Sequence, residues 1–212
     1  MPFLIIICVG IIVVLLFNLW GAVFGNKKVY GANLHMVSGS ASMKTWNTND
    51  FFNLTSDALV LQGDEIRTSS DAKVIMEFFD GTIVRVGGGS DLVLTSLDDS
   101  ESSPAIDVLL VNGQVWFNKV YKNSKAVISV TTDATSVKSI GSDIFEVENL
   151  MDKVVRVVYG DPVKLDILKE DGGKAVETET VGVGQEIIIT KDVLAKYRQF
   201  QSPSVLMALS DE

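Results

Sequence analysis

The side chains that could support catalysis or metal binding are few in this sequence. It has one histidine, His35, and one cysteine, Cys8. Hydrolysis needs a nucleophile with a base, or a metal ion held by several protein ligands. A Ser-His triad would depend on His35 alone, and a site with two histidine ligands cannot form within the chain. We therefore predict no enzyme activity, and we assign no catalytic, cofactor-binding or metal-binding residue.

Two short segments invite a ligand-binding interpretation. Asp98, Asp99 and Glu101 lie close together, and carboxylate oxygens are the ligands that Ca²⁺ prefers. Their spacing matches no calcium loop, so a solvated turn is favoured, and cation binding by residues 98–101 stays open. The triple glycine 87–89 lacks the Gly-Lys-Ser/Thr ending and the following helix of a phosphate-binding loop. We expect a bulge or a tight strand connection there instead.

The balance of charge limits the partners. The chain carries 27 acidic and 18 basic side chains, a net charge of −9, and all of them follow residue 26. A nucleic-acid partner requires a basic face, so we predict none. Because Cys8 lies in the apolar N-terminal run, the rest of the chain can form neither an internal disulfide nor a cysteine-ligated metal site.

The N-terminal run, residues 3–24, contains no charged side chain. A bilayer-spanning helix needs about 20 apolar residues, and Trp20 falls where an interfacial aromatic belt would lie. A cleaved signal peptide, the alternative, has a basic start and a shorter apolar core. We predict a transmembrane anchor at 3–24 and a linker at 25–36.

Two Gly-containing dipeptides predict β-hairpins. Apolar residues alternate with polar ones on both sides of Asp80-Gly81, which predicts paired strands over residues 72–86. Asn112-Gly113 is flanked by apolar runs at 108–111 and 114–117 and predicts a second hairpin. Both dipeptides are typical of type I′ turns, in which the two central residues have positive φ.

Short apolar runs separated by glycine turns continue to residue 190. This spacing predicts an all-β fold, a twisted β-roll or β-sandwich of short antiparallel strands, over residues 37–190. We expect Trp46 to pack against the core and Lys119 to Lys125 to form a solvated loop. The helical pattern after residue 190 predicts a short C-terminal helix within a tail at 191–212.

Taken in order, these segments resemble the FecR domain. The resemblance covers about residues 37–190, and Ser142 stands where threonine is usual. The segments that carry it are Gly63-Asp64-Glu65-Ile66-Arg67-Thr68, Ala72 to Gly81, Ser90 to Leu94, Val111 to Phe117, Val127 to Val130, Ile140 to Val147, Val157 to Val163 and Gly184-Gln185.

The resemblance implies a location and a role. In the FecR regulators an anti-sigma segment precedes the membrane helix, and the domain outside receives a signal from an outer-membrane transporter. Only Met1-Pro2 precedes the helix here, so we expect no anti-sigma segment. The expected protein is a single-pass bacterial envelope protein whose extracytoplasmic β-domain perceives a signal by binding a protein or a cell-wall ligand, without a small-molecule cofactor.

Two points stay open at this stage. Lys27 and Lys28 follow the predicted helix, and the positive-inside rule read alone would keep the β-domain in the cytoplasm. Two charges are a weak bias against the location that the resemblance implies. The alternative function is a lipid-transport component resembling the single-anchor β-jellyroll LptC, which would show an open apolar cleft between its sheets.

Overall fold

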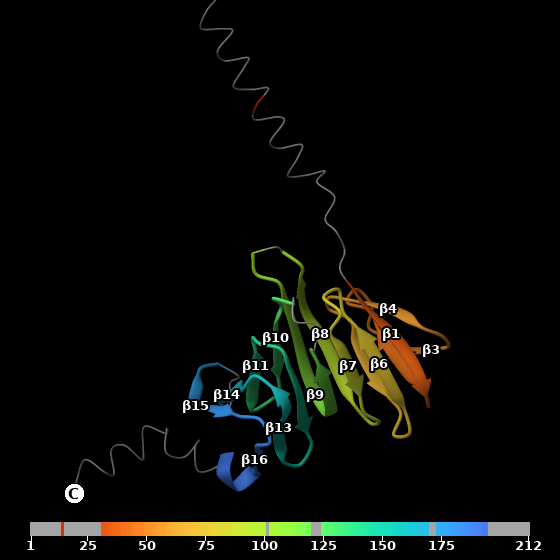
Figure 1. Cartoon of the computed structure of the whole chain (residues 1–212). Helices are drawn as coiled ribbons and strands as arrows, with labels where there is room; N and C mark the ends of the chain where they lie inside the picture. Colours follow the sequence, from red (N-terminus) through yellow and green to blue (C-terminus); the bar gives the residue numbers. More distant parts are fainter. Residues whose placement is uncertain (1–13, 15–30, 101, 120–123, 170–172, 195–212) are drawn as a thin grey trace, which may run out of the picture.

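The computed structural model describes residues 14, 31–100, 102–119, 124–169 and 173–194, which contain sixteen β-strands (Figure 1). The all-β prediction is therefore confirmed. The predicted anchor lies outside the described residues except for Val14, which is helical. No helix among the residues described has the length and apolarity to span a bilayer.

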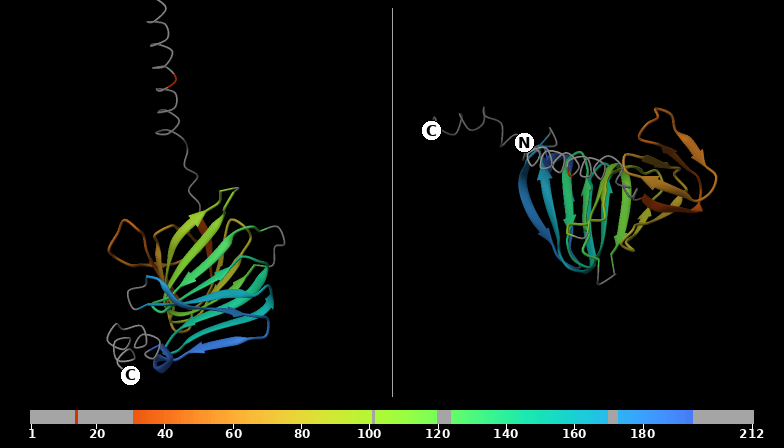
Figure 2. Two further views of the ribbon diagram at one scale, coloured as in Figure 1. Left: turned by 90° about the vertical axis from the view of Figure 1, so that its left-hand side faces the viewer. Right: turned by 90° about the horizontal axis from the view of Figure 1, so that it is seen from above.

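The strands form two sheets that share one strand, β9 (Ala105–Asn118). The first strands, in orange, lie at the opposite side of the molecule from the last, in blue (Figure 2). Sheet A has the spatial order β4 (Ala58–Leu61), β1 (Gly31–Ser38), β6 (Lys73–Glu77), β7 (Ile83–Val86), β9, β12 (Asp143–Asn149), β13 (Lys153–Gly160) and β16 (Glu186–Ile189). Sheet B has the order β3 (Phe52–Leu54), β2 (Ala41–Lys44), β5 (Glu65–Thr68), β8 (Asp91–Asp98), β9, β10 (Val127–Thr131), β11 (Thr135–Ser139), β14 (Val163–Leu168) and β15 (Ala175–Val181).

Alternate residues of both sheets point into one common core. In β6, for example, Val74 and Met76 are buried while Ile75 between them faces outward, as a strand period of two requires. The buried side chains of the two sheets form a single apolar cluster, in which the rings of Phe117 and Phe145 stack with their centroids 5.0 Å apart. The sheets are thus the two layers of a sandwich.

The hairpin at Asp80-Gly81 is confirmed, but its turn type is not. β6 and β7 pair antiparallel, and only Gly81 has a positive φ, of 80°. The Gly81 N–H donates to the Phe78 carbonyl, and the Phe78 N–H donates to Thr82. This is a three-residue loop that closes through a glycine bulge. The Asp80 carboxylate accepts bonds from the Thr82 N–H and hydroxyl, which favours this loop over the type I′ turn.

The second predicted hairpin is wrong, because β9 runs straight through Asn112-Gly113. Its first half pairs with β8 and β10 in sheet B, and its second half pairs with β7 and β12 in sheet A. Gly113 alone has a positive φ, of 99°, and a Cβ there would lie 2.2 Å from the Ser90 hydroxyl oxygen. The glycine lets the strand pass close to Ser90 as it changes sheet.

The strands are not all antiparallel. β9 and β10 pair in parallel, and segment 119–126 crosses from the end of β9 back to the level of its start. Parallel neighbours need such a crossover. Residues 120–123 of this segment lie outside the described residues.

Two smaller expectations also change, and the short C-terminal helix is confirmed in part. Residues 31–36 of the expected linker belong to β1. Trp46 is 70% exposed, because its backbone N–H is fixed by the Asp64 carboxylate and its Cβ packs on Gly63, which leaves the ring facing solvent. Residues 191–194 form a single helical turn, and the remainder of the predicted tail lies outside the described residues.

Candidate functional site

The one histidine is an exposed surface residue. Its Nδ1 lies 2.7 Å from the carboxylate of Asp57, and both side chains are open to solvent. The contact lowers the pKa of Asp57, with the hydrogen bond from His35 as the main cause. The ring thus forms a surface ion pair when protonated, and no hydroxyl nucleophile contacts it among the residues that the structure describes.

The two suspected ligand segments have structural explanations. Asp98 ends β8 and its carboxylate accepts a hydrogen bond from the Ser100 N–H at 2.8 Å, while Glu101 lies outside the described residues. Within the described ranges no group of three or more His, Cys, Asp or Glu side chains is placed to hold a metal ion. Residues 87–89 connect β7 to β8, as a tight connection, and a Cβ on Gly88 would meet the Ser70 carbonyl at 2.3 Å.

A shallow hollow lies on the outward face of sheet A. Its volume is about 450 Å³, and it extends over β1, β6, β7, β9 and β12. Four of its lining residues, Ile75, Arg85, Trp116 and Glu146, belong to one row that crosses the sheet from strand to strand. In order, this row consists of His35, Ile75, Arg85, Trp116, Glu146, Arg156 and Glu186.

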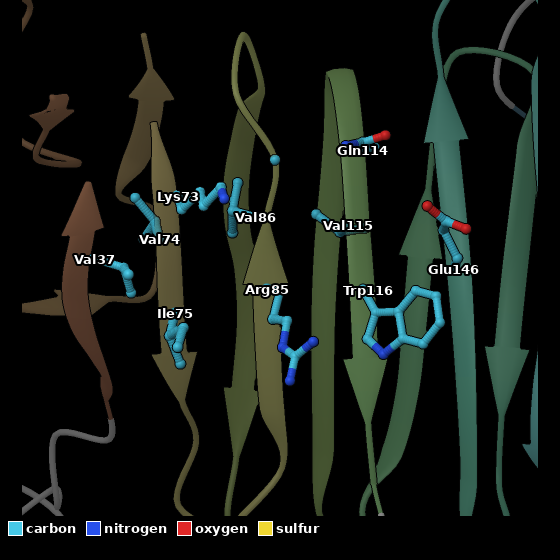
Figure 3. A pocket seen from close by; sticks show the side chains of 11 residues that line it. Val37, Lys73, Val74, Ile75, Arg85, Val86, Gln114, Val115, Trp116 and Glu146 are labelled. Carbon is cyan, nitrogen blue, oxygen red and sulfur yellow. The ribbon is translucent and has the colours of Figure 1, made fainter. Parts of the chain in front are cut away.

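The hollow combines an apolar floor with a few polar groups. Figure 3 shows the indole of Trp116 on β9 between Arg85 on β7 and Glu146 on β12. Val37, which is 59% exposed, and half-buried Ile75 add aliphatic surface beside them. An apolar concavity with a small number of convergent polar groups is the usual form of a binding site. We name this concavity, with all of its lining residues, the sheet A hollow.

The charges of this face are unevenly paired. Arg156 donates to Glu146 at 3.0 Å and also binds Glu148 and Glu186, so Glu146 is already neutralised. Neither Arg85 nor Lys73 has an ion-pair or hydrogen-bond partner among the residues described, and both are exposed. The hollow therefore presents two unpaired cations on a chain of net charge −9.

A second unusual group is Lys119, which we expected in a solvated loop. It is 1% exposed instead. Its ammonium group donates to the carbonyl of Ala126 and, at 3.2 Å, to that of Ile140. The lysine therefore ties the end of β9 to the start of β10 and the end of β11. Burial lowers its pKa, because the charged form loses hydration.

Three aspartates surround this buried lysine. The Asp143 side chain is fully buried and accepts a hydrogen bond from the Ser139 hydroxyl at 2.6 Å, while its Oδ1 has no partner. Burial raises the pKa of Asp143 to about 6. Asp80 binds Ser124, and Asp161 accepts from the Ser142 N–H at 3.1 Å. Their charges favour the protonated form of Lys119.

These two features differ in what they can do. The groups around Lys119 come from residues 79–82, 124–126, 139–143 and 160–161, and they hold the ends of strands together. The sheet A hollow is open to solvent and carries cations that nothing in the fold uses. We therefore take the hollow as the candidate binding site and the Lys119 cluster as a structural centre.

Comparison with known families gives one match. Residues 64–162 match the family described as FecR protein. This range contains β5 to β13 and all of the residues of the Lys119 cluster. No curated protein matches the chain.

Two crystal structures of a candidate anti-sigma factor from Parabacteroides distasonis ATCC 8503 are also similar. They have sequence identities of 20% and 19%, and each has a TM-score of 0.47. Each match covers 59% of this chain and 54% of the other, so the chain spans about half the length of that protein.

Proposed function

We propose, from the match of residues 64–162 to the FecR protein family, that the protein is a non-enzymatic envelope component that perceives a signal by binding a partner. The apolar run at 3–24 would tether it to the membrane, with the β-domain outside the cytoplasm. Binding would take place in the sheet A hollow.

The observation that carries this proposal is the unpaired Arg85 beside Trp116, together with the unpaired Lys73 in the same hollow. A solvated sheet face does not require a tryptophan side chain. Aromatic residues and arginine are enriched where proteins bind one another. Arg85 and Trp116 are direct cross-strand neighbours, so the sheet ladder fixes their backbones. The site is thus built on rigid strands.

The lipid-transport alternative has less support. It requires an open apolar cleft between the two sheets. In the described part of the chain that space is filled by fully buried side chains from both sheets, including Phe117, Phe145, Ile106 and Leu165. The exposed hollow lies on the other face of sheet A and has charged walls.

Two experiments test the proposal. Protease digestion should cleave the β-domain in spheroplasts and spare it in intact cells; protection in both would place the domain in the cytoplasm and contradict the proposed location. A photo-crosslinking residue at Val37, inside the hollow, should yield an adduct in intact cells that Trp116→Ala abolishes. The control places the same photo-crosslinking residue at Val183, which is similarly exposed but lies outside the hollow. Equal crosslinking from both positions would refute the assignment of the site.

A further inference from the structure

The charge pattern of the hollow indicates what kind of partner it takes, if the proposed function holds. We infer that the sheet A hollow binds an extended, acidic segment of a partner protein, in which a carboxylate side chain lies beside a large aliphatic one. The carboxylate would bind Arg85 and Lys73, and the aliphatic side chain would pack on the indole of Trp116, beside Arg85.

Arg85 differs from the other described arginines. Arg67 binds Glu65 and Asp91, both at 2.7 Å, and Arg156 binds three glutamates. In an acidic protein an arginine readily finds such partners.

The register explains why Arg85 finds none. Its direct cross-strand neighbours are Ile75 and Trp116, and Glu146 beyond the indole is held by Arg156. Glu77 lies two residues from Ile75 on β6 and forms no ion pair with Arg85. The guanidinium is therefore free for a carboxylate from outside, which it can bind with two parallel hydrogen bonds.

The neutral surface of the hollow favours a polypeptide over an acidic sugar. Val37, Ile75 and Trp116 offer aliphatic and aromatic area, and the uncharged hydrogen-bonding groups of the lining side chains are the Gln114 amide and the Trp116 indole N–H. A sugar chain would place some of its hydroxyl groups on the aliphatic surface of Val37 and Ile75, which offers them no hydrogen bond. The aliphatic side chains of a peptide need no hydrogen-bond partner there.

An extended peptide brings its residues to one face at every second position. A suitable probe is therefore a labelled, blocked peptide in which leucine and aspartate alternate on one face and serine occupies the other, Ser-Leu-Ser-Asp-Ser-Leu-Ser-Asp-Ser. Its matched controls replace both aspartates by asparagine, or both leucines by serine. Binding is measured by fluorescence anisotropy on the full chain in detergent at low and at moderate salt.

We expect the aspartate probe to bind at least about tenfold more tightly than either control peptide, because a charged hydrogen-bonded pair contributes that much. Arg85→Gln should remove the preference for aspartate over asparagine. Lys138→Gln, which removes an exposed cation from β11 in sheet B, should leave the preference unchanged.

Three outcomes would overturn the inference. One is equal binding of the aspartate and asparagine probes, and another is a preference for aspartate that survives Arg85→Gln. The third is binding of an oligogalacturonate, but not of the peptide, in a manner that depends on Arg85. If the peptide fails while the Val37 crosslink persists and still requires Trp116, the partner chemistry is wrong and the proposed function stands. Loss of the crosslink as well would reject both.

Discussion

The buried carboxylate of Asp143 should make the stability of this domain fall as the pH rises. Its pKa in the folded state is about 6, whereas the ordinary value is 3.8. Well below pH 3.8 the group is protonated in both states and costs nothing. As the pH rises through the interval between the two values, the unfolded state ionises first, so folding becomes less favourable.

The size of the effect follows from the difference between the two pKa values. One pKa unit corresponds to about 1.4 kcal/mol, so ionised Asp143 costs about 3 kcal/mol at neutral pH. About 2 kcal/mol of this cost develops between pH 4.5 and pH 7.5. Other carboxylates have lowered pKa values, such as Glu65 and Asp166, and they act in the opposite direction at low pH. Comparing the wild type with an Asp143 variant at the same pH removes the contribution of these other carboxylates.

The assay is urea unfolding of the full chain in a mild detergent, followed by tryptophan fluorescence at several pH values. Asp143→Asn cannot ionise, so its stability relative to the wild type should increase by about 2 kcal/mol from pH 4.5 to pH 7.5. Asp99→Asn, at an exposed position, is the control. A stability difference between wild type and Asp143→Asn that stays constant within about 0.5 kcal/mol would show that burial does not perturb this carboxyl, and the reasoning would fail.

Two further substitutions test the structural account. Lys119→Met should cost about 3–5 kcal/mol of unfolding free energy, since it leaves the buried Ala126 carbonyl, the part-buried Ile140 carbonyl and Asp143 without their cation. Exposed Lys138→Met should change this free energy by less than about 0.5 kcal/mol, and equal effects would contradict the burial of Lys119. Gly113→Ala should destabilise the domain more than Gly89→Ala, because both have positive φ but only the first would also bring a Cβ within 2.2 Å of another residue. Thermal melting of the two variants measures this, and equal shifts would mean that β9 does not pass close to Ser90.

Much of the fold follows from local patterns in the sequence. Ala72, Val74, Met76 and Phe78 place an apolar residue at every second position, as a half-buried strand requires, and Gly81 marks a turn that only a glycine adopts easily. These signals come from neighbouring residues and need no knowledge of the remaining chain. For the same reason they could not distinguish the turn types, because the Asp80 carboxylate that selects the loop also binds Ser124, far along the chain.

The parts that could not be predicted depend on distant contacts. Asn112-Gly113 has the composition of a hairpin turn, and the residue that makes it a bend instead is Ser90. Lys119 stands among polar residues, and the groups that bury it are backbone carbonyls, which leave no mark in the sequence.

The sheet A hollow could not be predicted from the sequence for a related reason. Arg85 and Trp116 become neighbours only through the register of β7 with β9. The alternation within β9 gave a partial signal, since Val115 and Phe117 are apolar and Trp116 between them must face the other side.

The passage of β9 through both sheets has a consequence for how the molecule opens. A sandwich whose layers have separate strands can lose one layer while the other persists. Here the central ladder of each layer includes the same strand, so β5 and β8 on one side and β6 and β7 on the other are expected to exchange their amide hydrogens as one cooperative unit. A ligand bound to the outward face of sheet A would then slow amide hydrogen exchange in both sheets.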